Sequence, residues 1–198
     1  MPFSRPMPLF LKPPKGVLLW GPPGTGKTRL VQGLVGTARG QGVASFAPTL
    51  ADLLRAEIGG SEAQLRGVLA AAHAAQPAIL FFDELDAVFP ERAGAGGGPD
   101  LVGVLAGVLD TWAAEAEGVR VLLVGATNWP GRVSHRLLVA DRFDLQIAVP
   151  LPDRAARLAI LRGVAGPGVA EHVLQQLADA LAGQSAAEVA RAVVPRAG

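Results

Sequence analysis

The sequence contains no cysteine and only three histidines, and both facts limit its chemistry. Without cysteine there is no disulfide framework and no thiolate metal site. The histidines, at positions 73, 135 and 172, are not spaced as zinc ligands, so the sequence does not support a structural zinc site.

Long apolar runs and a large net charge are also absent. Unbroken apolar stretches such as residues 78–82 and 121–124 are far shorter than the about 20 residues that cross a membrane. Lys and Arg number 18 against 17 Asp and Glu, so the chain lacks the positive field typical of nucleic-acid binding. The N-terminal segment MPFSRPMPLF lacks the longer apolar core of a secretory signal. We therefore expect a soluble protein of the cytoplasm without a membrane span.

The 198 residues, half of them hydrophobic, fit one globular domain with a small appendage. Residues 1–14 hold five of the sixteen prolines and predict an extended lead-in. In residues 15–151, short apolar runs alternate with helix-forming segments, which predicts a mostly parallel sheet covered by helices. Residues 152–198 predict a small helical subdomain, and the glycine-rich segment 91–100 a mobile loop. The expected strands are 16–20, 43–47, 78–82, 121–124 and 146–149, and the expected helices of the subdomain are 153–163, 169–181 and 185–194.

The segment GPPGTGKT, residues 21–28, fits the pattern G-x-x-x-x-G-K-[ST] and stands directly between a strand and a helix. Glycines in this pattern let backbone N–H groups surround a phosphate at the positive end of the following helix. We expect Lys27 to reach the β- and γ-phosphates of ATP and the Thr28 hydroxyl to ligate Mg²⁺. A chance glycine-rich turn is the alternative, and the flanking strand and helix argue against it. The predicted binding residues are Gly21, Pro22, Pro23, Gly24, Thr25, Gly26, Lys27 and Thr28.

The second motif is acidic: Asp83 and Glu84 directly follow the apolar run 78–82. Ligands bind at the carboxyl edge of open α/β sheets, so these carboxylates are expected beside the phosphate loop. Asp83 would then hold Mg²⁺, and Glu84 would deprotonate the water that attacks the γ-phosphate. A solvated acidic turn is the alternative. Asp86 is interpreted as a helix cap or a structural acid.

With both elements in place, the chain resembles the AAA family of ATPases, and specifically the group that remodels or unfolds proteins as ring hexamers. The resemblance runs from about residue 13 to 193 and includes the Walker A and Walker B segments. It implies a P-loop fold with strand order 5-1-4-3-2 and a helical lid. The matching segments are PPKGVLLWGPPGTGKT, PAILFFDELDAV, VGATN, DRFDLQIAVPLPD and GQSAAEVARAV.

The resemblance also implies roles for two further residues. Asn128 falls on the sensor position, where a neutral donor would contact the γ-phosphate or the attacking water. Arg142 matches an arginine finger, which enters the site of a neighbouring subunit and requires a head-to-tail ring. The alternatives are a turn residue for Asn128 and a surface ion pair of Arg142 with Asp141 or Asp144. In GQSAAEVARA, Ser185, Ala186 and Ala187 would pack near the ribose, although plain helix packing explains them equally well.

Four departures from the family pattern bear on function. Val139 stands where the family often has a second arginine, and Ser134-His135 where it has Asp-Pro. In the expected pore loop, Glu57-Ile58-Gly59 replaces an aromatic-aliphatic-glycine tripeptide, so threading of a polypeptide is in doubt. Only fourteen residues precede Lys15, so either base recognition is weakened or the chain is an excerpt of a longer protein.

Function is therefore expected to be Mg²⁺-dependent ATP hydrolysis in an oligomeric ring, a hexamer by resemblance, coupled to remodelling or unfolding of a protein partner. A nucleotide-dependent assembly switch with slow hydrolysis and no threading is the alternative, which Glu57 and Val139 favour. A loader of nucleic-acid machinery is a third reading, against which the near-neutral charge argues. A binding function without ATP would require both intact motifs, residues 21–28 and Asp83-Glu84, to have lost their function.

Overall fold

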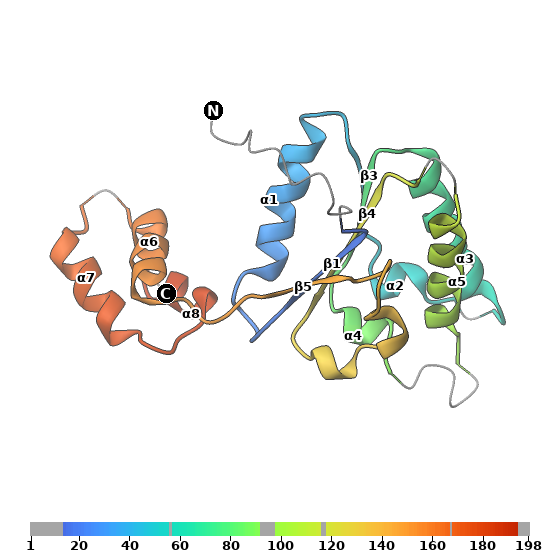
Figure 1. The fold of residues 1–198 in the computed structure, drawn as a ribbon. Helices are drawn as coiled ribbons and strands as arrows, with labels where there is room; N and C mark the ends of the chain where they lie inside the picture. Colours follow the sequence, from blue (N-terminus) through green and yellow to red (C-terminus); the bar gives the residue numbers. More distant parts are fainter. Residues whose placement is uncertain (1–13, 56, 92–97, 116–117, 167, 194–198) are drawn as a thin grey trace.

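A computed structural model describes residues 14–55, 57–91, 98–115, 118–166 and 168–193 (Figure 1). The expected lead-in at 1–14 lies almost wholly outside these residues, as does the middle of the glycine-rich segment 91–100. The strands are β1 (Gly16–Trp20), β2 (Ala44–Phe46), β3 (Ala78–Phe82), β4 (Val121–Thr127) and β5 (Leu145–Ala148). The helices are α1 (Lys27–Arg39), α2 (Leu50–Leu53), α3 (Gly60–Ala74), α4 (Leu85–Val88), α5 (Leu101–Ala113), α6 (Arg154–Val164), α7 (Glu171–Ala180) and α8 (Ala186–Arg191), with 3₁₀ turns η1 (Pro130–Arg132) and η2 (His135–Leu137).

The five strands form one parallel sheet in the order β2-β3-β4-β1-β5. This is the predicted order 5-1-4-3-2 read from the other edge, so the predicted fold class is confirmed. Because all strands run the same way, the carboxyl ends of β1, β3 and β4 lie side by side at one edge of the sheet. The phosphate loop, Asp83 and Asn128 each follow one of these three ends.

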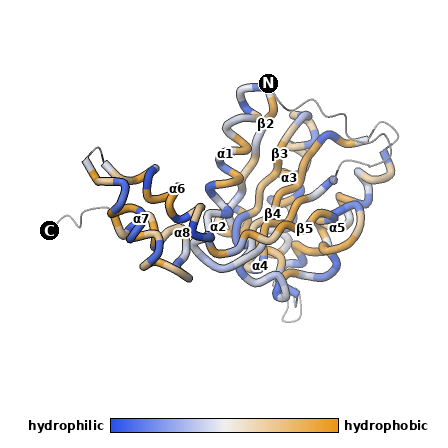
Figure 2. Tube along the Cα trace, turned by 60° about the vertical axis from the view of Figure 1, so that its left-hand side comes forward, coloured by the Kyte–Doolittle hydropathy of each residue, from blue (hydrophilic) through white to orange (hydrophobic). Residues whose placement is uncertain are grey.

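Helices cover both faces of the sheet (Figure 1). On one face α1 packs through Val31 against a cluster that includes Leu19, Ile79 and Val124. On the other face α2 to α5 enclose the larger core, and Figure 2 shows the strands as hydrophobic segments between these two layers. The sheet is thus held rigidly, which fixes the loops at its carboxyl edge.

The strands differ in burial more than their similar apolar sequences indicate. Every residue of β3 is buried, as expected for an inner strand of a parallel sheet. All four residues of β5 are exposed, and β5 is an edge strand of the sheet. The apolar runs therefore predicted both strands but not the difference in their burial.

Helices α6, α7 and α8 form a separate small cluster beside the sheet, at the left in Figure 1. Its core consists of Leu161, Leu174, Ala178 and Val189. Arg157 is buried there and donates to the carbonyls of Ala178 (2.7 Å) and Pro152 (2.9 Å), which ties the cluster to the segment that leads into it. We call α6 to α8 the lid. None of the helices among the described residues has the length and apolar character required to cross a membrane.

Candidate active site

The phosphate loop leaves β1 at Trp20 and enters α1 at Lys27. Gly26, directly before the helix, has φ 98°, a left-handed conformation that side chains disfavour. At Gly24 an added Cβ would lie 2.9 Å from Ser185 Oγ of the lid, and the Gly24 carbonyl accepts a hydrogen bond from Ala187 N (3.0 Å). The loop glycines therefore serve two needs, the turn into α1 and the close approach of the lid.

Lys27 is buried in the centre of the loop. Its ammonium donates to the carbonyl oxygens of Gly21 and Pro22, both at 2.8 Å. Burial lowers the pKa of Lys27 from its ordinary value, and the nearby Asp83 carboxylate opposes this shift. The side chain is thus held inside the ring of loop backbone where a bound phosphate would meet its charge.

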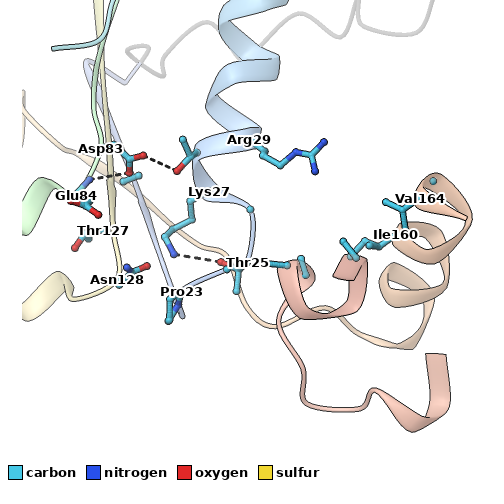
Figure 3. Close-up of a pocket in the computed structure, with 18 residues that line it drawn as sticks. Pro23, Thr25, Lys27, Arg29, Asp83, Glu84, Thr127, Asn128, Ile160 and Val164 are labelled. Carbon is cyan, nitrogen blue, oxygen red and sulfur yellow. Dashed lines mark hydrogen bonds between the residues drawn. The ribbon is translucent and has the colours of Figure 1, made fainter. Parts of the chain in front are cut away.

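Thr28 and Asp83 meet at the edge of the loop, although they are far apart in sequence. The Thr28 hydroxyl donates to Asp83 Oδ2 at 2.8 Å (Figure 3). A hydroxyl and a carboxylate oxygen are hard ligands of the kind Mg²⁺ prefers. Among the described residues, no cluster of three or more His, Asp or Glu side chains could form a complete metal cage. The donor set fits Mg²⁺, which commonly takes its remaining ligands from water and phosphate oxygens.

Glu84 is the residue before α4 and has a left-handed backbone, with φ 48° and ψ 50°. Such a conformation is uncommon for a residue other than glycine and costs about 1 kcal/mol or more. Its backbone N–H donates to Asp83 Oδ1 at 2.9 Å, so Asp83 orients the turn that carries Glu84. The side chain borders the loop cavity and a second cavity of about 350 Å³ near Thr49. A carboxylate next to the residues that could ligate Mg²⁺ suits a general base.

Asn128 directly follows β4 and lines the same cavity, and its role as a sensor stays a prediction. Its neighbour Thr127 is almost fully buried and donates to Asp86 Oδ1 of α4 at 2.5 Å. The Thr127 hydroxyl also accepts from the backbone N–H of Trp129 at 3.0 Å. This chain of bonds fixes both neighbours of Asn128 and links them to the helix that follows Glu84. No role was predicted for Thr127, and Asp86 was interpreted only as a helix cap or a structural acid, because their contact depends on the packing of α4 on β4.

The residues above surround a cavity of about 700 Å³ that lies between the sheet edge and the lid. Figure 3 shows Asp83, Glu84 and Asn128 on one side and the lid residues Ile160 and Val164 on the other. Ala186 and Ala187 also line the cavity, in the place the resemblance implied, while Ser185 caps α8 by accepting from Glu188 N at 3.3 Å. The sequence did not indicate the α6 residues or Arg29 of α1 as part of the wall.

Arg142 lies away from this cavity. Its backbone carbonyl packs against Gly16 at the start of β1, whereas the phosphate loop follows the end of that strand. The guanidinium donates to Asp110 Oδ1 of α5 at 2.7 Å and to the carbonyl of Arg136, and the side chain is 16% exposed. An ion pair was the alternative interpretation, but the partner is Asp110 and not Asp141 or Asp144. Arg142 therefore cannot reach the cavity of its own chain from this position.

The tripeptide Glu57-Ile58-Gly59 forms an exposed turn directly before α3. Ile58 is fully exposed to solvent, and Gly59 has φ 75°. The turn presents one aliphatic side chain beside a carboxylate, with no aromatic ring in the tripeptide.

Comparison with known proteins gives a consistent result. The family model described as "ATPase family associated with various cellular activities (AAA)" matches residues 17–151. The ATP-dependent zinc metalloprotease FtsH 4 of Sphaerobacter thermophilus is 40% identical over 187 residues, which cover 91% of this chain and 28% of that protein. FtsH of Mycobacterium tuberculosis is 38% identical over 197 residues, or 96% of this chain and 25% of that protein. A cell division cycle protein 48 homolog of Archaeoglobus fulgidus is 33% identical over 181 residues, or 90% of this chain and 24% of that protein. The chain thus spans about a quarter of the length of these relatives.

Proposed function

Because this chain belongs to the AAA family of ATPases, we propose that its loop cavity binds ATP with Mg²⁺ and hydrolyses it at the carboxyl edge of the sheet. The observation that carries the proposal is the convergence of Lys27, Thr28, Asp83, Glu84 and Asn128 on one cavity from the ends of three adjacent strands.

Each side chain has a chemical role in this proposal. Lys27 and the loop N–H groups would hold the β- and γ-phosphates, and Thr28 and Asp83 would hold Mg²⁺, which would supply positive charge next to the phosphate oxygens. Glu84 accepts a proton from water as the water oxygen bonds to the γ-phosphorus and the bond to the β–γ bridging oxygen breaks. Asn128 donates to the γ-phosphate or to the attacking water.

Arg142 serves as the arginine finger of a neighbouring copy in this proposal. Its position at the opposite end of β1 from the phosphate loop supports this role, because the guanidinium is remote from its own cavity. A contact that joins this surface of one copy to the cavity of the next is head-to-tail, and such contacts generate rings when the rotation closes. The Asp110–Arg142 ion pair would have to open on assembly.

The relatives' names include a protease and a cell division cycle protein. Because these names differ, the process that ATP hydrolysis drives in this chain is part of the proposal. We favour remodelling or unfolding of a protein partner, with movement of the lid against the sheet as the working step. The assembly switch without threading remains the second candidate, because Glu57-Ile58-Gly59 presents only Ile58 as an apolar contact. Cytoplasmic location and the division at residues 15 and 152 remain predictions.

The variant Glu84→Gln tests the catalytic role. We expect turnover to fall by about a hundredfold or more while ATP binding stays at the wild-type level, because the amide cannot take the proton. Phosphate release and nucleotide binding would be measured on the same preparation, with Glu171→Gln on the exposed lid surface as the matched control. Normal turnover in Glu84→Gln would remove Glu84 as the base.

A further inference from the structure

Arg29 is the one charged side chain of the described cavity wall that belongs neither to the phosphate loop nor to the carboxyl edge of the sheet. It stands two residues after Lys27 on α1. Each residue turns about 100° around the helix axis, so side chains two residues apart project to nearly opposite sides of the helix. Lys27 accordingly faces the loop carbonyls, whereas Arg29 projects toward the side of the cavity where Ile160 and Val164 lie (Figure 3).

Arg29 differs in its contacts from the arginines of the lid. Arg154 and Arg162 bind the carboxylates of Asp179 and Glu171, and Arg157 binds two backbone carbonyls. For the Arg29 guanidinium, no hydrogen bond or ion pair to another described residue is found. Its donors and its planar face are therefore presented to the cavity and to solvent.

The lid wall opposite Arg29 is apolar and contains no aromatic ring among the described residues. It consists of aliphatic side chains and glycine, among them Ile160, Val164 and Ala190. With the phosphates of ATP in the loop, the nucleoside extends toward this wall, which offers it aliphatic contact only. A guanidinium plane, in contrast, stacks on the face of a nucleobase and adds cation–π attraction.

We propose that the Arg29 guanidinium packs on the face of the purine of ATP and holds the nucleoside against the lid wall. The proposal rests on the proposed function only in placing the phosphates of ATP in the loop. A contact with the face of the base has two consequences that a contact with the γ-phosphate lacks. It is equal for ATP and ADP, and it is absent for inorganic tripolyphosphate, which carries no base.

The test measures dissociation constants of ATP, ADP and tripolyphosphate by titration calorimetry in the presence of Mg²⁺. For Arg29→Ala we expect ATP and ADP to bind about 5-fold to 30-fold more weakly. Tripolyphosphate should bind within about twofold of wild type, which also shows that the loop is folded. Arg29→Lys should not restore ATP binding, because an ammonium keeps the charge but lacks the planar face. Arg120→Ala, an exposed arginine next to the amino end of β4, is the matched control and should bind all three as wild type does.

Three results would overturn the proposal: wild-type ATP affinity in Arg29→Ala, an equal loss for tripolyphosphate, or full rescue by lysine. Each of them leaves the proposed ATP site intact, because the wild-type protein still binds ATP. Failure of the wild-type protein to bind ATP would instead overturn the proposed function, and this inference with it.

Discussion

The cavity edge and the surface around Arg142 differ in whether their side chains already hold their proposed working positions within one chain. At the cavity edge, Thr28 is bonded to Asp83 and Thr127 to Asp86, so the residues of the proposed site are oriented by contacts within their own chain. Around Arg142, the guanidinium is bonded to Asp110 on a different face of the domain and has no contact with the cavity. The residues of the first region are held in place at the cavity, whereas Arg142 is held in an ion pair away from it.

This difference indicates a division of labour between binding and catalysis. Preorganised donors at a site need no rearrangement when the substrate arrives, and this favours binding and transition-state stabilisation. Arg142 must leave its ion pair with Asp110 before it can act on a neighbouring copy. The full rate of ATP turnover therefore depends on the contact that opens this ion pair. We therefore expect a single copy to bind ATP well and to turn it over slowly.

The largest effect is expected at the centre of the binding region, for Lys27→Ala. Removal of the buried ammonium that the loop carbonyls hold should abolish nucleotide binding, with a loss of about a hundredfold or more. Titration with a fluorescent ATP analogue would measure the loss. Lys15→Ala, which removes a half-buried lysine paired at 3.8 Å with Asp141, should bind as wild type does. Tight binding by Lys27→Ala would contradict the proposed geometry of the loop.

A smaller effect is expected where the bonds orient Asn128 without touching substrate. Thr127→Val keeps the shape of the side chain but removes its bonds to Asp86 and to the Trp129 N–H. Because small displacements of catalytic groups are costly, we expect kcat to fall about 10-fold to 100-fold with little change in KM for ATP.

Steady-state kinetics would separate these two quantities. Thr37→Val in the exposed part of α1 removes a hydroxyl bonded only to the Gly33 carbonyl and serves as the control. Equal changes in kcat for the two valine variants would show that Thr127 has no positioning role.

The smallest effect is expected in the lid, where Ser185 caps α8 and forms a capping box with Glu188. Ser185→Ala should lower the free energy of unfolding by about 1 kcal/mol, because the helix loses its side-chain cap. Thermal or denaturant unfolding would measure it, and Ser185→Thr, which keeps a hydroxyl acceptor, should lose less. If Ser185→Ala instead weakened ATP binding without a change in stability, Ser185 would belong to the binding region.

The sequence predicted those features that depend on local pattern. The phosphate loop, the carboxylates after 78–82 and the strand order follow from motifs that each lie within a few residues or from the family resemblance, and the resemblance itself is confirmed by the match over 17–151. The bonds of Asp86 and Arg142 could not be predicted, because their partners lie 41 and 32 residues away and meet them only after the helices pack on the sheet. The exposure of β5 depends in the same way on the tertiary structure, because β5 is an edge strand of the assembled sheet.

The most direct test of this account is ATP turnover per subunit over a wide range of protein concentration, with Mg²⁺ present and with Arg142→Ala measured alongside wild type. Turnover per subunit of the wild type is expected to rise steeply with concentration, because Arg142 would complete the site of a neighbouring copy. Arg142→Ala should bind ATP normally and remain slow at every concentration. Wild-type turnover that is the same per subunit at all concentrations, or that Arg142→Ala matches, would contradict the claim that the site is completed between copies.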